Sequence, residues 1–183
     1  MDVVKNLKQI KLLKYLFFAL MGSIILAISS KIKIPFYPVP MTMQTFVIMF
    51  IGITFGWKLG VATTVLYLFE GIIGLPVFSG TPEKGLGLVY FTGPTMGYLI
   101  GFIITVYLVG KFTYDNNLIK TFFKLSFAIS FIYIFGMIWL GFLLGWDKPI
   151  FKLGAQPFLL AELFKILIAT FAINKLIKLR KFI

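Results

Sequence analysis

Two ionisable residues of opposite charge stand three positions apart near the end of the sequence. Glu162 and Lys165 lie in the otherwise apolar run 157–165, PFLLAELFK. Residues three apart share one face of a helix, so the carboxylate and the ammonium can neutralise each other. A carboxylate can also accept N–H groups of a ligand, and an ammonium can donate to a ligand carbonyl or carboxylate. The pair is therefore either a structural ion pair or the polar end of a ligand pocket.

Two further polar residues fall at the ends of apolar segments. Glu70 stands near the end of the run 59–73 and is followed by glycine at positions 71 and 74. A carboxylate near a membrane interface can reach water or accept from a loop amide, so we interpret Glu70 as structural. Gln44 follows the Pro-rich run 34–40, and its amide can both donate and accept. By itself, Gln44 indicates no particular ligand.

Small residues recur at a spacing of four in three places, a pattern that lets helices approach closely in lipid. The rows are Ala19, Ser23 and Ala27; Gly52, Gly56 and Gly60; and Gly93, Gly97 and Gly101. We expect the second and third rows to pack inside the molecule. For the first row, internal packing and the docking of a partner protein are equal alternatives.

The composition is that of a protein embedded in lipid. Of the 183 residues, 60% are hydrophobic and 13% are charged, whereas soluble domains are about a quarter charged. The net charge of +12 comes from basic residues that stand mostly between apolar runs, which argues against nucleic-acid binding. Cysteine and histidine are absent, so the usual catalytic base, thiol and metal ligands are missing. We expect no enzyme, no cofactor and no metal site.

The length of the apolar runs predicts an all-α integral membrane protein. A helix needs about 20 mostly apolar residues to cross the hydrocarbon core. The runs predict a six-helix transmembrane bundle with spans at residues 12–30, 43–56, 59–73, 95–109, 122–144 and 158–177. The second and third spans are short and are separated by Trp57 and Lys58 alone, which predicts an antiparallel hairpin. With no linker-like stretch, residues 1–183 are expected to form a single membrane domain.

Structured outer loops are expected between the spans. Prolines in the run 34–40 favour extended geometry, and the connection 74–91 contains the turn formers SGTPEKG at 79–85. The lysines Lys5, Lys8, Lys11 and Lys14 precede an apolar run, as in a signal peptide, but that run continues into a loop without a small-residue cleavage pattern. We therefore interpret these lysines as part of an interfacial helix.

The basic residues predict the orientation, because cytoplasmic loops carry an excess of lysine and arginine. With the N-terminus inside, twelve of the 18 basic residues are cytoplasmic: Lys5, Lys8, Lys11, Lys14, Lys58, Lys111, Lys120, Lys124, Lys175, Lys178, Arg180 and Lys181. The outer loops hold Lys31, Lys33, Lys84, Lys148 and Lys152, while Lys165 lies within the sixth span. Both termini are expected to be cytoplasmic, in a multi-pass protein of the cell membrane.

Four stretches of the sequence resemble one known family. They are residues 34–35 with 38–46 (PVPMTMQTF), 74–80 (GLPVFSG), 93–102 (GPTMGYLIGF), and 157–159 with 162–165 (PFL and ELFK). In this order and at these membrane depths, they are similar to the BioY family, the biotin-binding S components of energy-coupling-factor (ECF) transporters. The resemblance covers most of the chain.

The resemblance implies a bundle that captures biotin from outside, in a cavity closed by the first and third outer loops. It implies no ATPase activity in the chain itself, but a transmembrane coupling protein and a pair of cytoplasmic ATPases as partners. The row Ala19, Ser23 and Ala27 resembles the surface used for docking. An S component for another vitamin is the nearest alternative, and a non-catalytic structural membrane subunit is a more distant one.

The ligand-binding residues that follow from this resemblance are Gln44, Glu162, Lys165, Phe36, Val39, Phe78, Ser79 and Tyr98. The ureido ring of biotin offers N–H donors and a carbonyl, its thiophane ring and valeryl chain are apolar, and its carboxylate is anionic. We expect Glu162 or Gln44 to accept from the ureido N–H groups and Lys165 to donate to a ligand oxygen. The aliphatic and aromatic members of the set would bury the rest.

The sequence also departs from the family pattern. The family usually has aspartate where Glu162 stands, glycine where Ala161 and Met96 stand, and a glycine-rich run in place of residues 81–84. Glutamate keeps the charge and reaches one methylene further, and the carboxylate and ammonium pair is retained. The change at 81–84 lies in a loop and is expected to alter lid stiffness more than specificity.

Overall fold

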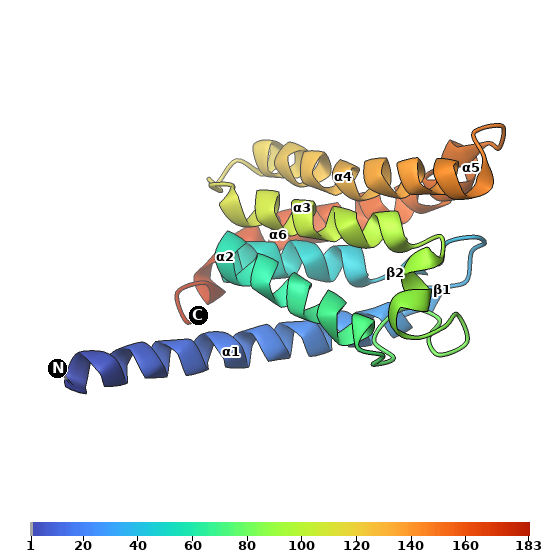
Figure 1. Cartoon of the computed structure of the whole chain (residues 1–183). Coiled ribbons are helices and arrows are strands. Elements are labelled where there is room, and N and C mark those ends of the chain that lie inside the picture. The colour runs from blue at the N-terminus through green and yellow to red at the C-terminus, as the bar shows by residue number, and fades with distance from the viewer. Residues whose placement is uncertain (1) are drawn as a thin grey trace.

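Long helices run side by side and carry loops at one end of the molecule. A computed structural model describes the backbone of residues 2–183 and the side chains of residues 9–183. The helices are α1 (Asp2–Lys31), α2 (Gln44–Ile72), α3 (Met96–Lys111), α4 (Leu118–Leu144), α5 (Ile150–Gly154) and α6 (Leu159–Leu179). In Figure 1, α1 extends beyond the other helices at its N-terminal end. The predicted all-α class is confirmed.

Helix α2 reverses direction in its middle. Gly56 has φ 71° and ψ 176°, a backbone conformation that glycine adopts readily because it has no Cβ. Gln44 Nε2 lies 2.8 Å from Tyr67 Oη, although a separation of 23 positions would span about 35 Å in a straight helix. The hairpin predicted from Trp57 and Lys58 is therefore present, and the non-helical residue is Gly56.

Glycines allow close contacts between the helices. A Cβ atom on Gly52 would lie 2.7 Å from Val109 Cγ1 on α3. A Cβ atom on Gly101 would lie 2.5 Å from Ile132 Cα on α4. Because carbon atoms in contact are about 3.5–4.0 Å apart, larger side chains at these positions would push the helices apart. The internal packing expected for the two glycine rows is confirmed at Gly52 and Gly101.

Short elements gather at the end of the bundle away from both chain termini, which we call the loop end (Figure 1). Two strands, β1 (Lys33–Ile34) and β2 (Met41–Thr42), form an antiparallel ladder. A 3-10 helix, η1 (Gly87–Thr92), follows α2, and a second one, η2 (Gln156–Phe158), leads into α6. The ladder is an addition to the predicted all-helical structure, and it closes the Pro-rich segment between α1 and α2.

The surface of the bundle is apolar where that of a soluble protein would be polar. Phe127, Leu160 and Phe171 are 56%, 67% and 71% exposed. By length and composition, four stretches of the described chain could cross a membrane: Gln9–Lys31, Gln44–Ile72, Leu118–Leu144 and Ile150–Leu179. Helix α3 is also apolar but shorter. An exposed apolar surface of this extent is stable only in lipid.

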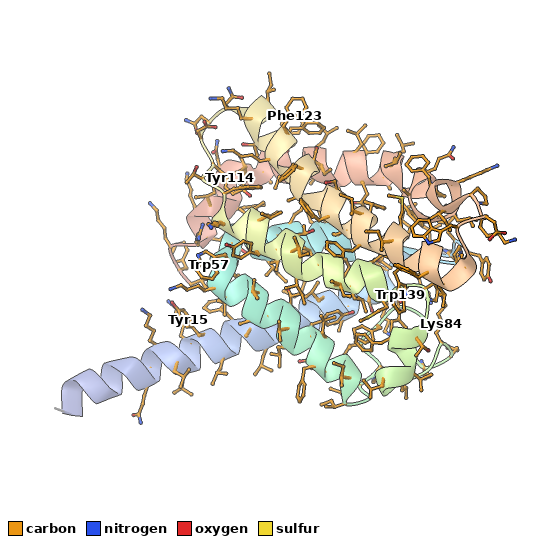
Figure 2. The ribbon with its side chains drawn as sticks, turned by 45° about the horizontal axis from the view of Figure 1, so that its top comes forward. Tyr15, Trp57, Lys84, Tyr114, Phe123 and Trp139 are labelled. Carbon is orange, nitrogen blue, oxygen red and sulfur yellow. The ribbon has the colours of Figure 1, made fainter. Side chains whose placement is uncertain are left out.

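Aromatic and basic residues meet at the end opposite the loop end. Lys58 Nζ lies 5.4 Å from the centre of the Trp57 ring. Such pairs are typical of a membrane–water interface. Figure 2 shows Trp57 at this end of the molecule and Lys84 at the loop end. The side chains of Lys5 and Lys8, which belong to the expected interfacial helix, lie outside the described residues.

Candidate functional site

The ion pair on α6 is buried at the loop end. Glu162 and Lys165 are 4% and 6% exposed, and Lys165 Nζ lies 2.8 Å from Glu162 Oε1. Helix α6 begins at Leu159, directly after η2, so Glu162 lies in its first turn. Negative charge is favoured there because the N-terminal end of a helix is partly positive. The shared helix face predicted from the spacing of three is confirmed.

All three donors of Lys165 are used by protein atoms. Its ammonium donates to the Thr42 carbonyl at 2.6 Å, to Thr45 Oγ1 at 3.0 Å and to Glu162 Oε1 at 2.8 Å. An ammonium has three donors, so none is left for a ligand in this geometry. The structure therefore differs from the expectation that Lys165 donates to a ligand oxygen. Lys165 instead ties α6 to β2 and to the start of α2.

A cavity of about 50 Å³ lies between the loops and the helices. Its wall comes from the segments around β2, from α2, α3, α4 and α6, and from the loop between α2 and α3. The lining residues are Val39, Pro40, Met41, Thr42, Gln44, Thr45, Phe78, Ser79, Tyr90, Thr95, Tyr98, Leu99, Phe102, Ile132, Tyr133, Phe158 and Glu162. The structure thus brings together Gln44, Glu162, Val39, Phe78, Ser79 and Tyr98 from the predicted set.

Two polar atoms of residues in the cavity wall have no hydrogen-bond partner. Glu162 Oε2 and Ser79 Oγ are both buried and unpaired. An unpaired buried group costs about 1–3 kcal/mol, and more if it is charged. In contrast, Glu162 Oε1 accepts from Thr45 Oγ1 at 2.8 Å as well as from Lys165. The protein fixes one oxygen of this carboxylate by hydrogen bonds. The other makes none, although the Tyr133 hydroxyl of the same cavity wall interacts with the carboxylate, so this oxygen can accept from a ligand donor.

Gln44 belongs to a hydrogen-bond chain that joins two loops. Its Oε1 accepts from Thr42 Oγ1 at 3.1 Å, and its Nε2 donates to Tyr67 Oη at 2.8 Å. Tyr67 in turn donates to the Val77 carbonyl at 3.1 Å. The side-chain amide of Gln44 retains one N–H and one lone pair, because an amide has two of each. Gln44 can therefore contact a ligand while it couples β2 to the loop that follows α2.

Three consecutive carbonyls anchor the loop between α2 and η1. Each accepts from a different side chain: Val77 from Ser30 Oγ at 2.7 Å, Phe78 from Lys31 Nζ at 2.9 Å, and Ser79 from Tyr90 Oη at 2.8 Å. Burial raises the pKa of the Tyr90 phenol above its ordinary value of about 10, so the phenol stays a donor. Tyr90 also stacks on Phe78, with ring centres 4.7 Å apart. These contacts hold Phe78 and Ser79 against the cavity.

The predicted apolar wall is present except for one residue. Val39, Phe78 and Tyr98 are buried and line the cavity. Phe36 is 39% exposed, and its ring contacts Phe158 edge to face with ring centres 5.8 Å apart. Because Phe158 itself lines the cavity, Phe36 supports the wall from behind and does not form it.

The first row of small residues contacts α2. Ala19 and Ser23 are buried, and Ser23 Oγ donates to Glu70 Oε1 at 2.8 Å. Ala27 is half-buried. Of the two alternatives for this row, internal packing accounts for Ala19 and Ser23 in the structure. Glu70 does not line the cavity, in agreement with its structural interpretation, although its partner is a hydroxyl of α1 and not a loop amide.

Sequence reasoning missed several residues of the site. Thr45 accepts from Lys165 and donates to Glu162. Its position beside Gln44, at the start of a helix, is the sequence feature that could have indicated a role in the site. Tyr90 precedes a second aromatic residue within a loop, which indicates a packing role. The ring of Tyr133 on α4 stacks on that of Phe158, which directly precedes α6. Nothing in the local sequence indicates this contact.

The fold and the site define a helical integral membrane protein with a small ligand cavity, partly polar and partly apolar, beneath loops at one end. Residues 4–182 match the BioY family. The chain therefore belongs to the BioY family.

Known proteins resemble the chain over most of its length. It is 32% identical over 143 residues to a probable biotin transporter BioY of Pyrococcus horikoshii, covering 76% of this chain and 81% of that protein. It is 30% identical over 156 residues to the biotin transporter BioY of Thermotoga maritima, covering 85% and 90%. The crystal structure at 2.1 Å of the S-component for biotin from an ECF-type ABC transporter matches with a TM-score of 0.75 at 27% identity, covering 92% and 93%.

Proposed function

We propose that this chain is the substrate-binding (S) subunit of an ECF transporter and that it captures biotin at the loop end. The observation that carries the proposal is the pair of buried, unpaired polar atoms, Glu162 Oε2 and Ser79 Oγ, in the residues that line one cavity. Membership of the BioY family, and relatives described as biotin transporters, support biotin as the ligand.

The polar groups of the cavity are complementary to biotin. Glu162 Oε2 accepts from a ureido N–H, because this oxygen alone in the carboxylate has no protein donor. Ser79 Oγ donates to a ureido or carboxylate oxygen of the ligand. Gln44 adds one N–H and one lone pair. Each of these contacts replaces a missing partner, so the free energy gained includes relief of the unpaired state.

The remaining parts of the site bury the ligand and hold its contacts in place. Val39, Phe78 and Tyr98 cover the thiophane ring and the valeryl chain. Lys165 acts as a positioning residue, since it reaches the ligand only through the orientation it imposes on Glu162. The cavity of about 50 Å³ is small beside the about 300–1,000 Å³ of typical ligand pockets, so the loops have to move to admit biotin.

The proposal extends to the rest of the transporter. The chain has no ATPase of its own, and a transmembrane coupling protein with two cytoplasmic ATPases supplies the energy. Helices α1, α3, α4 and α6 and the two halves of α2 make six crossings of the cell membrane, with both termini cytoplasmic and residues 1–183 acting as one membrane domain. Basic residues at the end opposite the loop end, Lys58 among them, support this orientation.

The proposal includes docking of the coupling protein on α1. Ala27 is the half-buried member of the row and is open to a partner. Contact through Ala19 and Ser23 would require α1 to separate from α2, because both are buried there.

Titration of the purified protein in detergent with biotin, thiamine and riboflavin tests the proposal. Tight binding of biotin alone is the expected result. Tight binding of thiamine or riboflavin in its place would assign the chain to another vitamin. A failure to bind any vitamin would reject the S-subunit function.

A further inference from the structure

A second, wider cleft opens at the loop end next to the inner cavity. It has a volume of about 380 Å³ and is lined by Tyr37, Pro38, Lys84, Tyr90, Gly93, Pro94, Thr95, Leu143 and Leu144. Tyr90 and Thr95 line both the cleft and the inner cavity, so the two spaces are neighbours that share a wall. We call this space the outer cleft.

The outer cleft has one basic residue, Lys84, and the stem of its side chain packs against a glycine. The stem of Lys84 lies over Gly80, because a Cβ atom on Gly80 would be 2.8 Å from Lys84 Cδ. The Lys84 amide donates to the Gly80 carbonyl at 2.8 Å, which closes a tight turn. Figure 2 shows Lys84 at the loop end, on the same side of the molecule as Trp139. Trp139 donates to the carbonyl of Gly93, another residue of the cleft wall, at 2.8 Å.

No carboxylate of the described chain neutralises this lysine. The salt bridges within residues 9–183 are Lys120 to Asp115, Lys148 to Asp147, and Lys165 to Glu162. Glu83, the neighbour of Lys84 in sequence, is exposed and does not line the cleft. Lys84 is itself exposed, but partial burial, and then the charge of Lys33, lower its pKa below the ordinary value. An anion in the cleft would relieve both effects.

We infer that the outer cleft is a capture subsite for the carboxylate of the ligand, in which Lys84 pairs with that group before the loops admit the ligand to the inner cavity. The ligand class is a small carboxylic acid with an apolar body, since Leu143, Leu144 and Tyr37 supply apolar walls beside the ammonium. The inference rests on the proposed function, and it assigns Lys84 to the rate of capture and not to the final affinity. Electrostatic attraction acts on association more than on the bound state.

Association kinetics of biotin and of its neutral amide, biotinamide, test the inference. The variants are Lys84→Gln, Lys84→Glu and, as a matched control, Lys152→Gln. Lys152 is exposed, as Lys84 is, and lies on α5 at the same end of the molecule but does not line the outer cleft. Lys84→Gln is expected to slow biotin association about threefold and Lys84→Glu about tenfold, with biotinamide unchanged, because only the anion is attracted. Lys152→Gln is expected to match the wild type. Raising the salt concentration should slow association of biotin, but not of biotinamide, to the wild-type protein.

The outcomes separate this inference from the proposed function. If the wild type binds biotin tightly but Lys84→Gln associates at the wild-type rate, the capture subsite is rejected and the proposed function stands. Equal slowing of biotin and biotinamide by Lys84→Gln would also reject it, because the effect would then not depend on the carboxylate. Absence of biotin binding by the wild type would reject the proposed function itself.

Discussion

Glu162 and Glu70 are both carboxylates on apolar helices, and each accepts from a hydroxyl at 2.8 Å, yet their surroundings differ. Glu162 is buried at the loop end and lines the cavity, and one of its carboxylate oxygens has no hydrogen-bond partner. Glu70 is half-buried in the contact between α1 and α2 and lies away from the cavity. An acidic residue in an apolar helix therefore does not by itself indicate a ligand. The stronger indication is a buried oxygen with no hydrogen-bond partner in a residue that lines a cavity.

The energetics of the two regions also differ. A buried ion pair such as Glu162 with Lys165 loses the hydration of both charges, and only well-placed hydrogen bonds offset that loss. Thr42 and Thr45 supply those hydrogen bonds. The contact between Ser23 and Glu70 needs no such support, because Glu70 keeps partial access to its surroundings. Substitutions in the first region should therefore have the larger effects.

The largest effect is expected for Glu162→Gln. The variant loses the charged acceptor for a ureido N–H, and biotin affinity should fall about 100-fold, as for loss of a buried hydrogen bond to a charged group. Glu162→Asp keeps the charge and should stay within about tenfold of the wild type. Equilibrium titration with biotin measures both, after thermal unfolding has verified that each variant is folded. Wild-type affinity of Glu162→Gln would remove Glu162 from the site.

Lys165→Met should come second. It leaves the Glu162 carboxylate buried without its counter-charge, which costs about 3–5 kcal/mol of stability, and biotin affinity should fall about 30-fold because the carboxylate is no longer oriented. Lys175→Met, an exposed position on the same helix, is the matched control. Thermal unfolding in detergent and biotin titration provide the two readouts. Similar unfolding temperatures for the two variants would contradict the structural role of Lys165.

Ser79→Ala separates binding from stability. Its hydroxyl has no partner in the protein, so removing it should leave the unfolding temperature unchanged or slightly raised. Biotin affinity should fall about fivefold, which corresponds to about 1 kcal/mol for one neutral hydrogen bond. The same two measurements test this. A lower unfolding temperature with unaltered affinity would show that the hydroxyl serves the fold and not the ligand.

The smallest effect is expected for Ser23→Ala. The variant removes the hydrogen bond to Glu70 and should cost about 0.5–1.5 kcal/mol of stability without changing biotin affinity. This outcome would complete the contrast between the two carboxylates. A loss of biotin affinity comparable with that of Ser79→Ala would mean that the contact between α1 and α2 is coupled to the cavity.

The features that could be predicted depend on residues close together in the sequence. The α2 hairpin follows from a short turn between two apolar runs, and the ion pair follows from the spacing of Glu162 and Lys165. The true partners of Lys165 could not be predicted, because the Thr42 carbonyl lies 123 residues away. Phe36 and Val39 are both apolar loop residues, so the sequence alone does not show that Phe36 is exposed and Val39 is buried. The folded structure of the loop decides this. Strands of two residues, such as β1 and β2, are too short for any periodic signal.

Under the proposed function, the short helix α3 sets the depth at which the ligand is held. Its first turn packs beside Trp139, since a Cβ atom on Gly97 would lie 2.5 Å from Trp139 Cβ, whereas α4 continues to Leu144. The five further residues of α4 correspond to about 7 Å, so α3 begins below the end of its neighbour, in contact with η1. A bound vitamin would therefore lie below the rim, flanked by hydrocarbon. The low local dielectric constant there would strengthen each of its few polar contacts.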